Sequence, residues 1–172
     1  METFSFNTTL RKFQSSPLWG WYFDVPENIA TVFTKGSERR VICTINDHIF
    51  IHCALMPNKG TWFILLNKEN VKKISLPENH EISVKITKDN SEYGMPMPDE
   101  LNEVLLQDYK AYEYFHALTP GKQRSLIYLI NKIKSSEIKI RKSLVIADHL
   151  VANSGKLDHK LLYEGLRDYN KF

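Results

Sequence analysis

The residues best equipped for chemistry lie between Ala117 and Lys142, in a stretch rich in lysine and arginine. Its one acidic residue is Glu137, so most of its positive charges have no local compensation. Such cations bind carboxylates and phosphates, and the segment therefore indicates binding more than bond chemistry. The basic residues of the stretch are Lys122, Arg124, Lys132, Lys134, Lys139, Arg141 and Lys142.

The start of a helix inside this stretch predicts an anion site. Thr119 is expected to cap that helix, with Pro120 in its first turn. Free backbone amides and the helix dipole favour negative charge at such a start. The predicted site, for phosphate or a carboxylate, consists of Thr119, Gly121, Lys122 and Arg124. The alternative is a capped helix whose basic side chains are simply solvated.

A partner-binding surface is predicted on the outer face of the same helix and on the next one. Arg124, Tyr128 and Asn131 recur at helical spacing opposite Leu126. The surface is expected to attract an acidic protein, lipid headgroups or another anionic ligand, or weakly to position nucleic-acid phosphates. Its predicted residues are Tyr128, Lys132, Lys139, Arg141 and Lys142. A solvated helix face is the alternative reading.

The histidines and acids predict no metal, cofactor or catalytic residue. His48 and His52 stand four residues apart on an expected strand, about 13 Å at ~3.3 Å per residue, too far to share one ion. Glu113 and His116 form a Glu-x-x-His pair on an expected helix, the spacing that di-iron helix bundles use. Such bundles need a second Glu-x-x-His pair, which the sequence lacks. The sequence also contains no nucleophile-elbow, phosphate-loop, dinucleotide or zinc-protease motif. The acids at 99, 100 and 103 are expected to compensate a helix dipole.

Aromatic residues in the N-terminal half have two readings. Trp19, Trp21, Trp62 and Phe63 fall on expected strands. They could line a ligand pocket, but at alternating strand positions they more often fill the interior of a small barrel.

Length and composition indicate ordinary globular material. The 172 residues are 42% hydrophobic and 25% charged, with a net charge of +3. That charge is too small for a dedicated nucleic-acid protein. No run approaches the ~18 apolar residues of a membrane span, and the first residues lack the pattern of a secretory signal. We therefore expect a cytoplasmic location.

The two cysteines are expected to remain free. If Asn46 and Asp47 form a two-residue hairpin turn, Cys43 lies opposite Phe50, and Cys53 opposite Arg40. The thiols would then point to opposite faces of the hairpin, which excludes a disulfide between them.

Hydropathy predicts an α+β chain with two parts. Residues 4–87 alternate with a period of two and predict six or seven short strands. A short helix is expected after Pro26, and another after Asn67, which is expected to be its N-cap. Short strands without long helices between them favour a small β-barrel over residues 1–92. Residues 93–98 read as a proline-rich connector. Residues 99–172 then predict three or four helices, with the first continuous to about Leu118. The third is expected to be capped by Ser135 or Ser136 and to carry Ile140, Leu144, Ala147 and Val151 on one face.

The helical half resembles the YdeI/OmpD-associated family, also described as bacteriocin-protection proteins. The resemblance lies in the residues 118–124 (LTPGKQR), a hydrophobic helix, and then 134–142 (KSSEIKIRK). The family more usually has Ala-Lys ahead of Glu-Thr-Arg, where this chain has Ile133-Lys134 ahead of 137–139 (Glu-Ile-Lys). Because lysine cannot grip an oxyanion bidentately as arginine can, the departure implies less specific binding at that triplet.

The N-terminal half resembles the small domain of unknown function that often precedes this region. The matching features are WYFDVP at 21–26, the Asn46-Asp47 turn followed by His48, and the strand at 60–66. The resemblance implies a double-split β-barrel, shared in outline with AbrB-type DNA-binding proteins.

Together these features predict a non-enzymatic cytoplasmic binding protein of the bacteriocin-protection or envelope-stress type, acting through its basic helical surface. The alternative is a weak nucleic-acid-binding protein with an AbrB-like barrel. The oligomeric state is left open.

Overall fold

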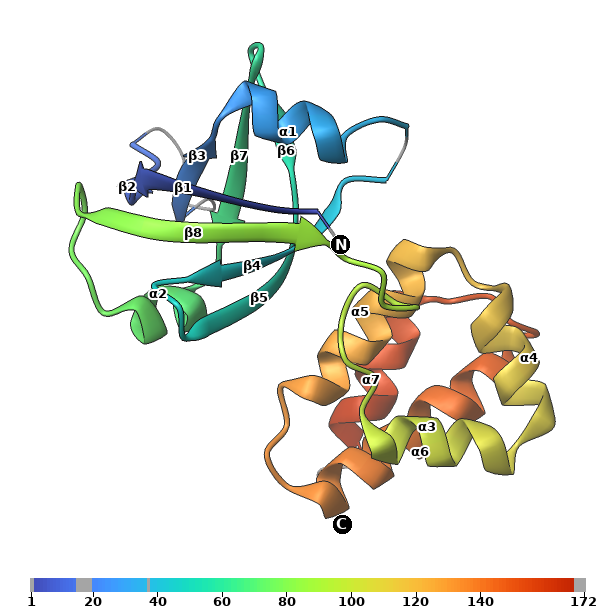
Figure 1. Ribbon diagram of the computed structural model, residues 1–172. Coiled ribbons are helices and arrows are strands. Elements are labelled where there is room, and N and C mark those ends of the chain that lie inside the picture. The colour runs from blue at the N-terminus through green and yellow to red at the C-terminus, as the bar shows by residue number, and fades with distance from the viewer. Residues whose placement is uncertain (1, 15–19, 37, 169–172) are drawn as a thin grey trace. The chain divides into compact units, whose positions relative to one another are not determined.

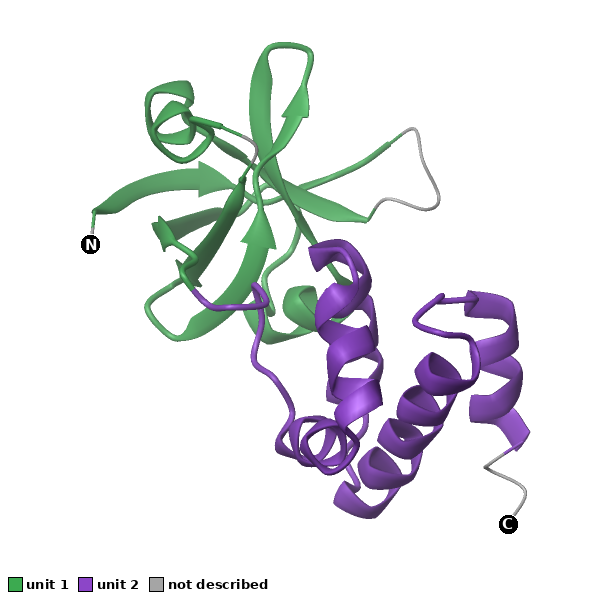
Figure 2. Cartoon of the chain, turned by 90° about the vertical axis from the view of Figure 1, so that its right-hand side faces the viewer, with its two compact units in different colours: residues 1–90 green, residues 91–172 purple. Residues whose placement is uncertain are grey.

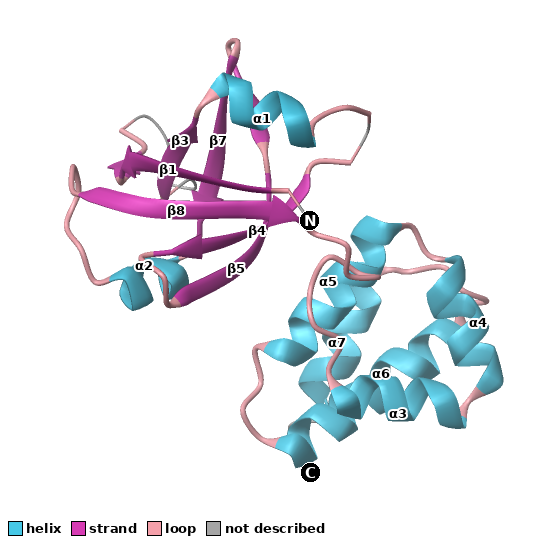
Figure 3. Cartoon of the chain, viewed as in Figure 1, coloured by secondary structure: helices cyan, strands magenta, loops and turns pink. Residues whose placement is uncertain are grey.

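The structure is a computed structural model that describes residues 2–14, 20–36 and 38–168. Its contacts divide the chain between Asn90 and Ser91 into two compact units, coloured separately in Figure 2. Unit 1 contains the strands and unit 2 is helical, so the α+β class is confirmed (Figure 3). Within the described residues, no helix combines the length and apolarity needed to cross a membrane.

Unit 1 holds two antiparallel sheets, labelled in Figure 1. The first has the order β1-β8-β4-β5 and the second β2-β3-β7-β6. The strands are β1 (Thr3–Thr9), β2 (Arg11–Lys12), β3 (Trp21–Val25), β4 (Arg40–Ile45), β5 (Ile49–Ala54), β6 (Met56–Asn58), β7 (Thr61–Leu66) and β8 (Glu81–Lys88). In β4, β5 and β8, alternate residues are buried, as period-two hydropathy predicts.

The predicted barrel does not close. Among the described residues, no strand of one sheet pairs with a strand of the other. Packing of side chains between the sheets, in place of continuous strand pairing, forms the core of this unit. Phe23, Ile64 and Ile86 are fully buried in it.

Two short helices complete unit 1. Helix α1 (Glu27–Phe33) follows Pro26, and α2 (Lys68–Ile74) follows Asn67. The Asn67 side chain accepts a hydrogen bond from the Asn70 amide at 2.8 Å, which confirms the predicted cap.

The hairpin between β4 and β5 differs from the prediction by one residue. The connecting loop is Asn46, Asp47 and His48, and Val41 faces Cys53 across the ladder. Asn46 is held by β8, because its backbone amide donates to the Ser83 carbonyl and its side chain accepts from the Ser83 amide. β5 therefore resumes pairing one residue later, and each of its residues faces a different partner from the predicted one.

Unit 2 packs its helices around α6 (Ser136–Ala152), which contacts all the others named here. Those helices are α3 (Asp99–Gln107), α4 (Tyr109–Ala117), α5 (Pro120–Asn131) and α7 (His159–Asp168). Phe115, Leu126, Ile130 and Leu150 are fully buried where they meet. Ser135 caps α6 by accepting from the Ile138 amide, one of the two caps predicted for it.

The predicted first helix of unit 2 is in fact two helices. Asp108 lies between α3 and α4, and its carboxylate accepts hydrogen bonds from the Lys110 and Ala111 amides at 3.0 and 3.1 Å. An aspartate that caps a new helix competes with continuation of the previous one, so the chain turns at this point.

Candidate functional site

The start of α5 presents the predicted anion-site residues on the surface. Thr119 occupies the N-cap position, but its side chain makes no capping hydrogen bond. Gly121 and Lys122 are exposed, and Arg124 is half-buried. A Cβ built on Gly121 would meet no atom within 4 Å. The start of α5 is therefore uncovered at Gly121 and carries Lys122 and Arg124 in its first two turns. Free amides at a helix start favour an anion, and the two cations add to that preference.

Tyr128 and Lys132 lie together on the exposed face of α5. The Lys132 Nζ sits 4.2 Å from the centroid of the Tyr128 ring, in cation–π contact. The Tyr128 side chain is 42% exposed. Asn131, expected on the same open face, instead donates a hydrogen bond to the Pro96 carbonyl of the connector at 2.8 Å. The open part of this face thus runs from Arg124 to Lys132.

The basic residues of α6 are largely neutralised by acids. Lys139 Nζ lies 3.6 Å from Glu100 Oε2, and Arg141 pairs with Glu137 one turn earlier. Lys142 is half-buried. Hydrogen bonding to its own backbone amide, to the Ser136 hydroxyl and to Lys139 holds the pKa of the Glu100 carboxyl below its usual range. The structure therefore separates the predicted surface into an open part on α5 and a part on α6. In the α6 part, Lys139 and Arg141 are paired with acids, whereas Lys142 makes no ion pair with any described residue.

His48 and His116 take structural positions. His48 bonds to the Asn46 carbonyl within its own turn. His116 joins Tyr93 through Nε2 at 2.9 Å and the Tyr112 carbonyl through Nδ1 at 2.8 Å. Burial, with Glu92 beside it, raises the pKa of Tyr93 to about 12. In the described part of the chain, no three metal-ligating side chains come together.

A buried acid in unit 1 was missed by sequence reasoning. The Asp89 carboxylate is completely buried and lies 2.9 Å from His52 Nδ1. His52 also lines a hollow of about 530 Å³ beside Trp21 and Arg40. Asp89 directly follows β8. Nothing in the neighbouring sequence distinguishes it from the exposed acids of the chain, so its burial could not be predicted.

The aromatic residues of unit 1 do not gather around one hollow. Trp21 lines the hollow beside His52, Trp62 lines another of about 400 Å³, and Phe63 is buried. Trp19 lies outside the described residues.

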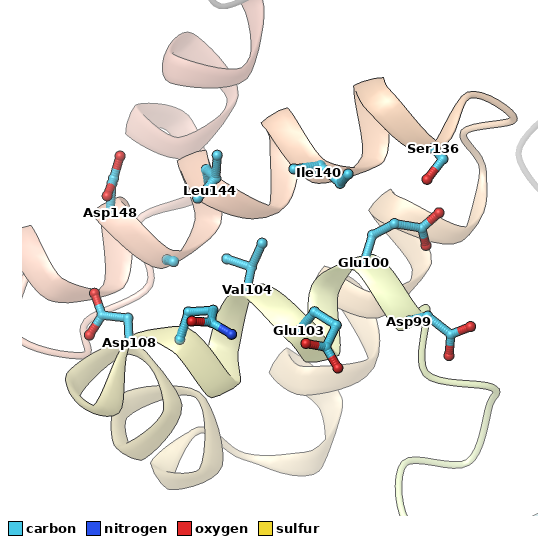
Figure 4. Close-up of a pocket in the computed structure, with 11 residues that line it drawn as sticks. Asp99, Glu100, Glu103, Val104, Asp108, Ser136, Ile140, Leu144 and Asp148 are labelled. Atoms are coloured by element: carbon cyan, nitrogen blue, oxygen red, sulfur yellow. The ribbon is translucent and has the colours of Figure 1, made fainter.

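A second feature missed from the sequence is a groove between α3 and α6, which we call the α3–α6 groove (Figure 4). Its volume is about 530 Å³. Its floor is apolar and its rim carries carboxylates from both helices. The lining residues are Asp99, Glu100, Glu103, Val104, Gln107, Asp108, Ser136, Ile140, Leu144, Ala147 and Asp148.

Ile140 and Leu144 explain why this groove was missed. Their spacing with Ala147 does place them on one face of α6, as predicted, but they remain 43% and 41% exposed in the groove. The sequence places apolar residues on one face of a helix, but it does not show whether another helix covers that face.

Comparison with known families accounts for most of the chain. Residues 6–86 match the family described as Domain of unknown function (DUF1905). Residues 94–153 match the family described as Bacteriocin-protection, YdeI or OmpD-Associated. No curated protein and no solved structure matches the chain.

Proposed function

Because the chain joins a DUF1905 domain to a bacteriocin-protection, YdeI or OmpD-associated domain, we propose that it is a non-enzymatic binding protein of the bacteriocin-protection type. It acts in the cytoplasm, as part of an envelope-stress response, by holding an acidic partner protein. Its contact surface is the α5 basic surface, which consists of Lys122, Arg124, Tyr128 and Lys132.

The observation that carries this proposal is the contact between Lys132 and the exposed Tyr128 ring. The ring holds the ammonium group in place while leaving it open to a carboxylate. Lys122 and Arg124, on the same helix, make no ion pair with any described residue. Three cations and one aromatic ring on a single helix suit an acidic protein surface, where tyrosine and arginine are favoured contact residues.

Charge reversal on α5 tests the proposal. Cells that lack the endogenous protein are complemented with the wild-type chain or with the Lys122→Glu/Arg124→Glu variant and then exposed to bacteriocin. We expect the variant to be expressed and folded but to lose protection, together with capture of the acidic partner from lysate. The matched control, Lys110→Glu/Lys160→Glu, makes the same charge change at exposed positions of α4 and α7 and should protect like wild type. Equal protection by all three chains would remove the α5 basic surface from the function.

Binding of duplex DNA by the wild-type chain separates this function from weak nucleic-acid binding. If the wild-type chain binds duplex DNA through its phosphates, the logarithm of the binding constant should fall linearly with the logarithm of the salt concentration. If duplex binds in this way and no acidic protein is captured, the nucleic-acid alternative replaces the proposal.

A further inference from the structure

We propose that the α3–α6 groove is a docking site for a cationic amphipathic helix of a partner polypeptide. The site differs in place and in charge from the α5 basic surface, and it does not depend on the function proposed above. Three features carry it, namely an apolar floor, an acidic rim and a length that suits a short helix.

The floor offers an unpartnered apolar stripe. Val104 projects from α3 towards Ile140 and Leu144 on α6 (Figure 4). Leucine and isoleucine that remain more than two-fifths exposed in adjoining positions form an apolar patch, and such patches commonly mark interaction sites. A groove between two helices, lined along one stripe of each, fits the apolar face of a third helix.

The rim selects the charge of the partner. Among the described residues, five carboxylates line the groove, and no lysine, arginine or histidine does so. Glu100 is paired with Lys139, and Asp108 caps α4. Asp99, Glu103 and Asp148 make no ion pair with any described residue. The net charge of the chain is +3 and would repel a cation. Attraction of a cationic partner must therefore come from the carboxylates of the groove itself.

The spacing of the acids sets the size of the partner. Asp99 and Glu100 lie at the end of the groove next to Ser136, Glu103 lies near its middle beside Val104, and Asp108 and Asp148 lie at the other end (Figure 4). From residue 136 to residue 148 the α6 axis rises about 18 Å, at ~1.5 Å per residue. A helix of about three turns spans this length, with basic residues near both ends and apolar residues at i, i+4 and i+7 between them.

The test uses a synthetic peptide and the full chain. The peptide is an amphipathic helix of about four turns with leucines on one face and lysines flanking them. Its control has the same composition in scrambled order, so that its charge is equal and its apolar face is lost. Titration calorimetry measures affinity, and amide chemical shifts in NMR report where the peptide binds. We expect binding of the ordered peptide only, with shifts concentrated in α3 and α6.

Two groove variants probe the floor and the rim separately. Leu144→Ala removes a half-exposed floor side chain, and Glu103→Gln/Asp148→Asn removes two rim charges that make no ion pair. Each variant should raise the dissociation constant of the peptide at least tenfold, equivalent to about 1.4 kcal/mol. Peptide binding by the rim variant should also depend less on salt concentration. The matched control Glu27→Gln/Glu69→Gln removes two exposed acids of unit 1 and should bind like wild type.

Three results would overturn the proposal. Equal binding of the ordered and scrambled peptides would reduce it to general charge attraction. Unchanged affinity in both groove variants would place the peptide elsewhere. The wild-type chain could also sediment as a dimer while the Leu144→Ala variant sediments as a monomer. A second copy of the chain would then be the occupant of the groove.

Discussion

The sulfur atoms of Cys43 and Cys53 lie 3.5 Å apart on the same buried face of the β4–β5 hairpin. This overturns the prediction that the two thiols point to opposite faces. Both cysteines are nevertheless free, as expected. The difference comes from the three-residue loop, since moving β5 by one residue turns every one of its side chains to the other face.

The paired thiols should be inert in the folded protein. The hydrogen bond with Cys53, together with burial, raises the pKa of the Cys43 thiol well above its usual value. Thiolate is the reactive form, so reaction with an aromatic disulfide reagent at mildly alkaline pH should be far slower than for free cysteine. In guanidinium chloride, both thiols of the chain should react at once. Rapid release of even one equivalent from the native protein would contradict this arrangement.

Gly155 should be needed for the turn after α6. Its φ is +78°, and a Cβ there would lie 2.7 Å from the Tyr114 ring. Its amide donates to the Leu150 carbonyl at 2.8 Å, which closes the end of the helix. Gly155→Ala should lower the free energy of unfolding by more than about 1 kcal/mol. Urea unfolding followed by circular dichroism measures this loss. Gly121→Ala is the control, because Gly121 lies in the first turn of α5 with open space around it, and it should cost nothing.

His149 should make unit 2 less stable as the pH falls. Burial lowers the pKa of this imidazole, whose Nε2 accepts the Asp158 amide at 3.2 Å at the start of α7. Below the unfolded-state pKa of about 6.5, the unfolded chain binds a proton that the folded chain resists, so the stability decreases as the pH drops through that value. Urea titrations monitored by helical circular dichroism should show the decrease for the wild type.

Replacing the histidine provides the comparison for this pH dependence. His149→Gln should give a flatter profile below neutral pH, because no imidazole is left to titrate. His80→Gln, an exposed histidine of unit 1, should retain the wild-type profile. Identical profiles for all three chains would assign the acid sensitivity to other groups.

Asp89 should stabilise unit 1 through its contact with His52. Its carboxylate is completely buried, so Asp89→Asn weakens a buried polar contact that water cannot replace. We expect a loss of about 1–3 kcal/mol in the free energy of unfolding. Asp24→Asn is the matched control, since Asp24 is 46% exposed and lies 3.8 Å from Arg11. That change should stay within about 0.5 kcal/mol. Equal losses would show that burial of Asp89 does not matter.

Local chemistry was sufficient to predict much of the fold. Alternating hydropathy predicts the strands because strand side chains point to opposite faces in turn. Asn67 and Ser135 predict helix starts because their side chains satisfy amides within the same few residues. Asp108 was missed for a related reason, since its two capping bonds compete with a continuous helical pattern that hydropathy alone favours.

The candidate sites depended more on distant neighbours. The sequence predicts a basic stretch, but the structure pairs Lys139 with Glu100, which lies 39 residues earlier in the chain. It likewise leaves Ile140 and Leu144 uncovered beside an acidic rim. Charge and hydropathy are properties of single residues, and compensation or burial depends on which residues the fold brings beside them.

The sequence by itself therefore determined the two-part α+β organisation, most helix and strand positions and the family of each part, because these depend on interactions within a few residues and on local motifs. Only the tertiary structure decided the register of β5, the separation of the two sheets, the pairing of Lys139 with Glu100 and the existence of the α3–α6 groove. Each of these depends on contacts between segments far apart in the chain, for which no local pattern carries a signal.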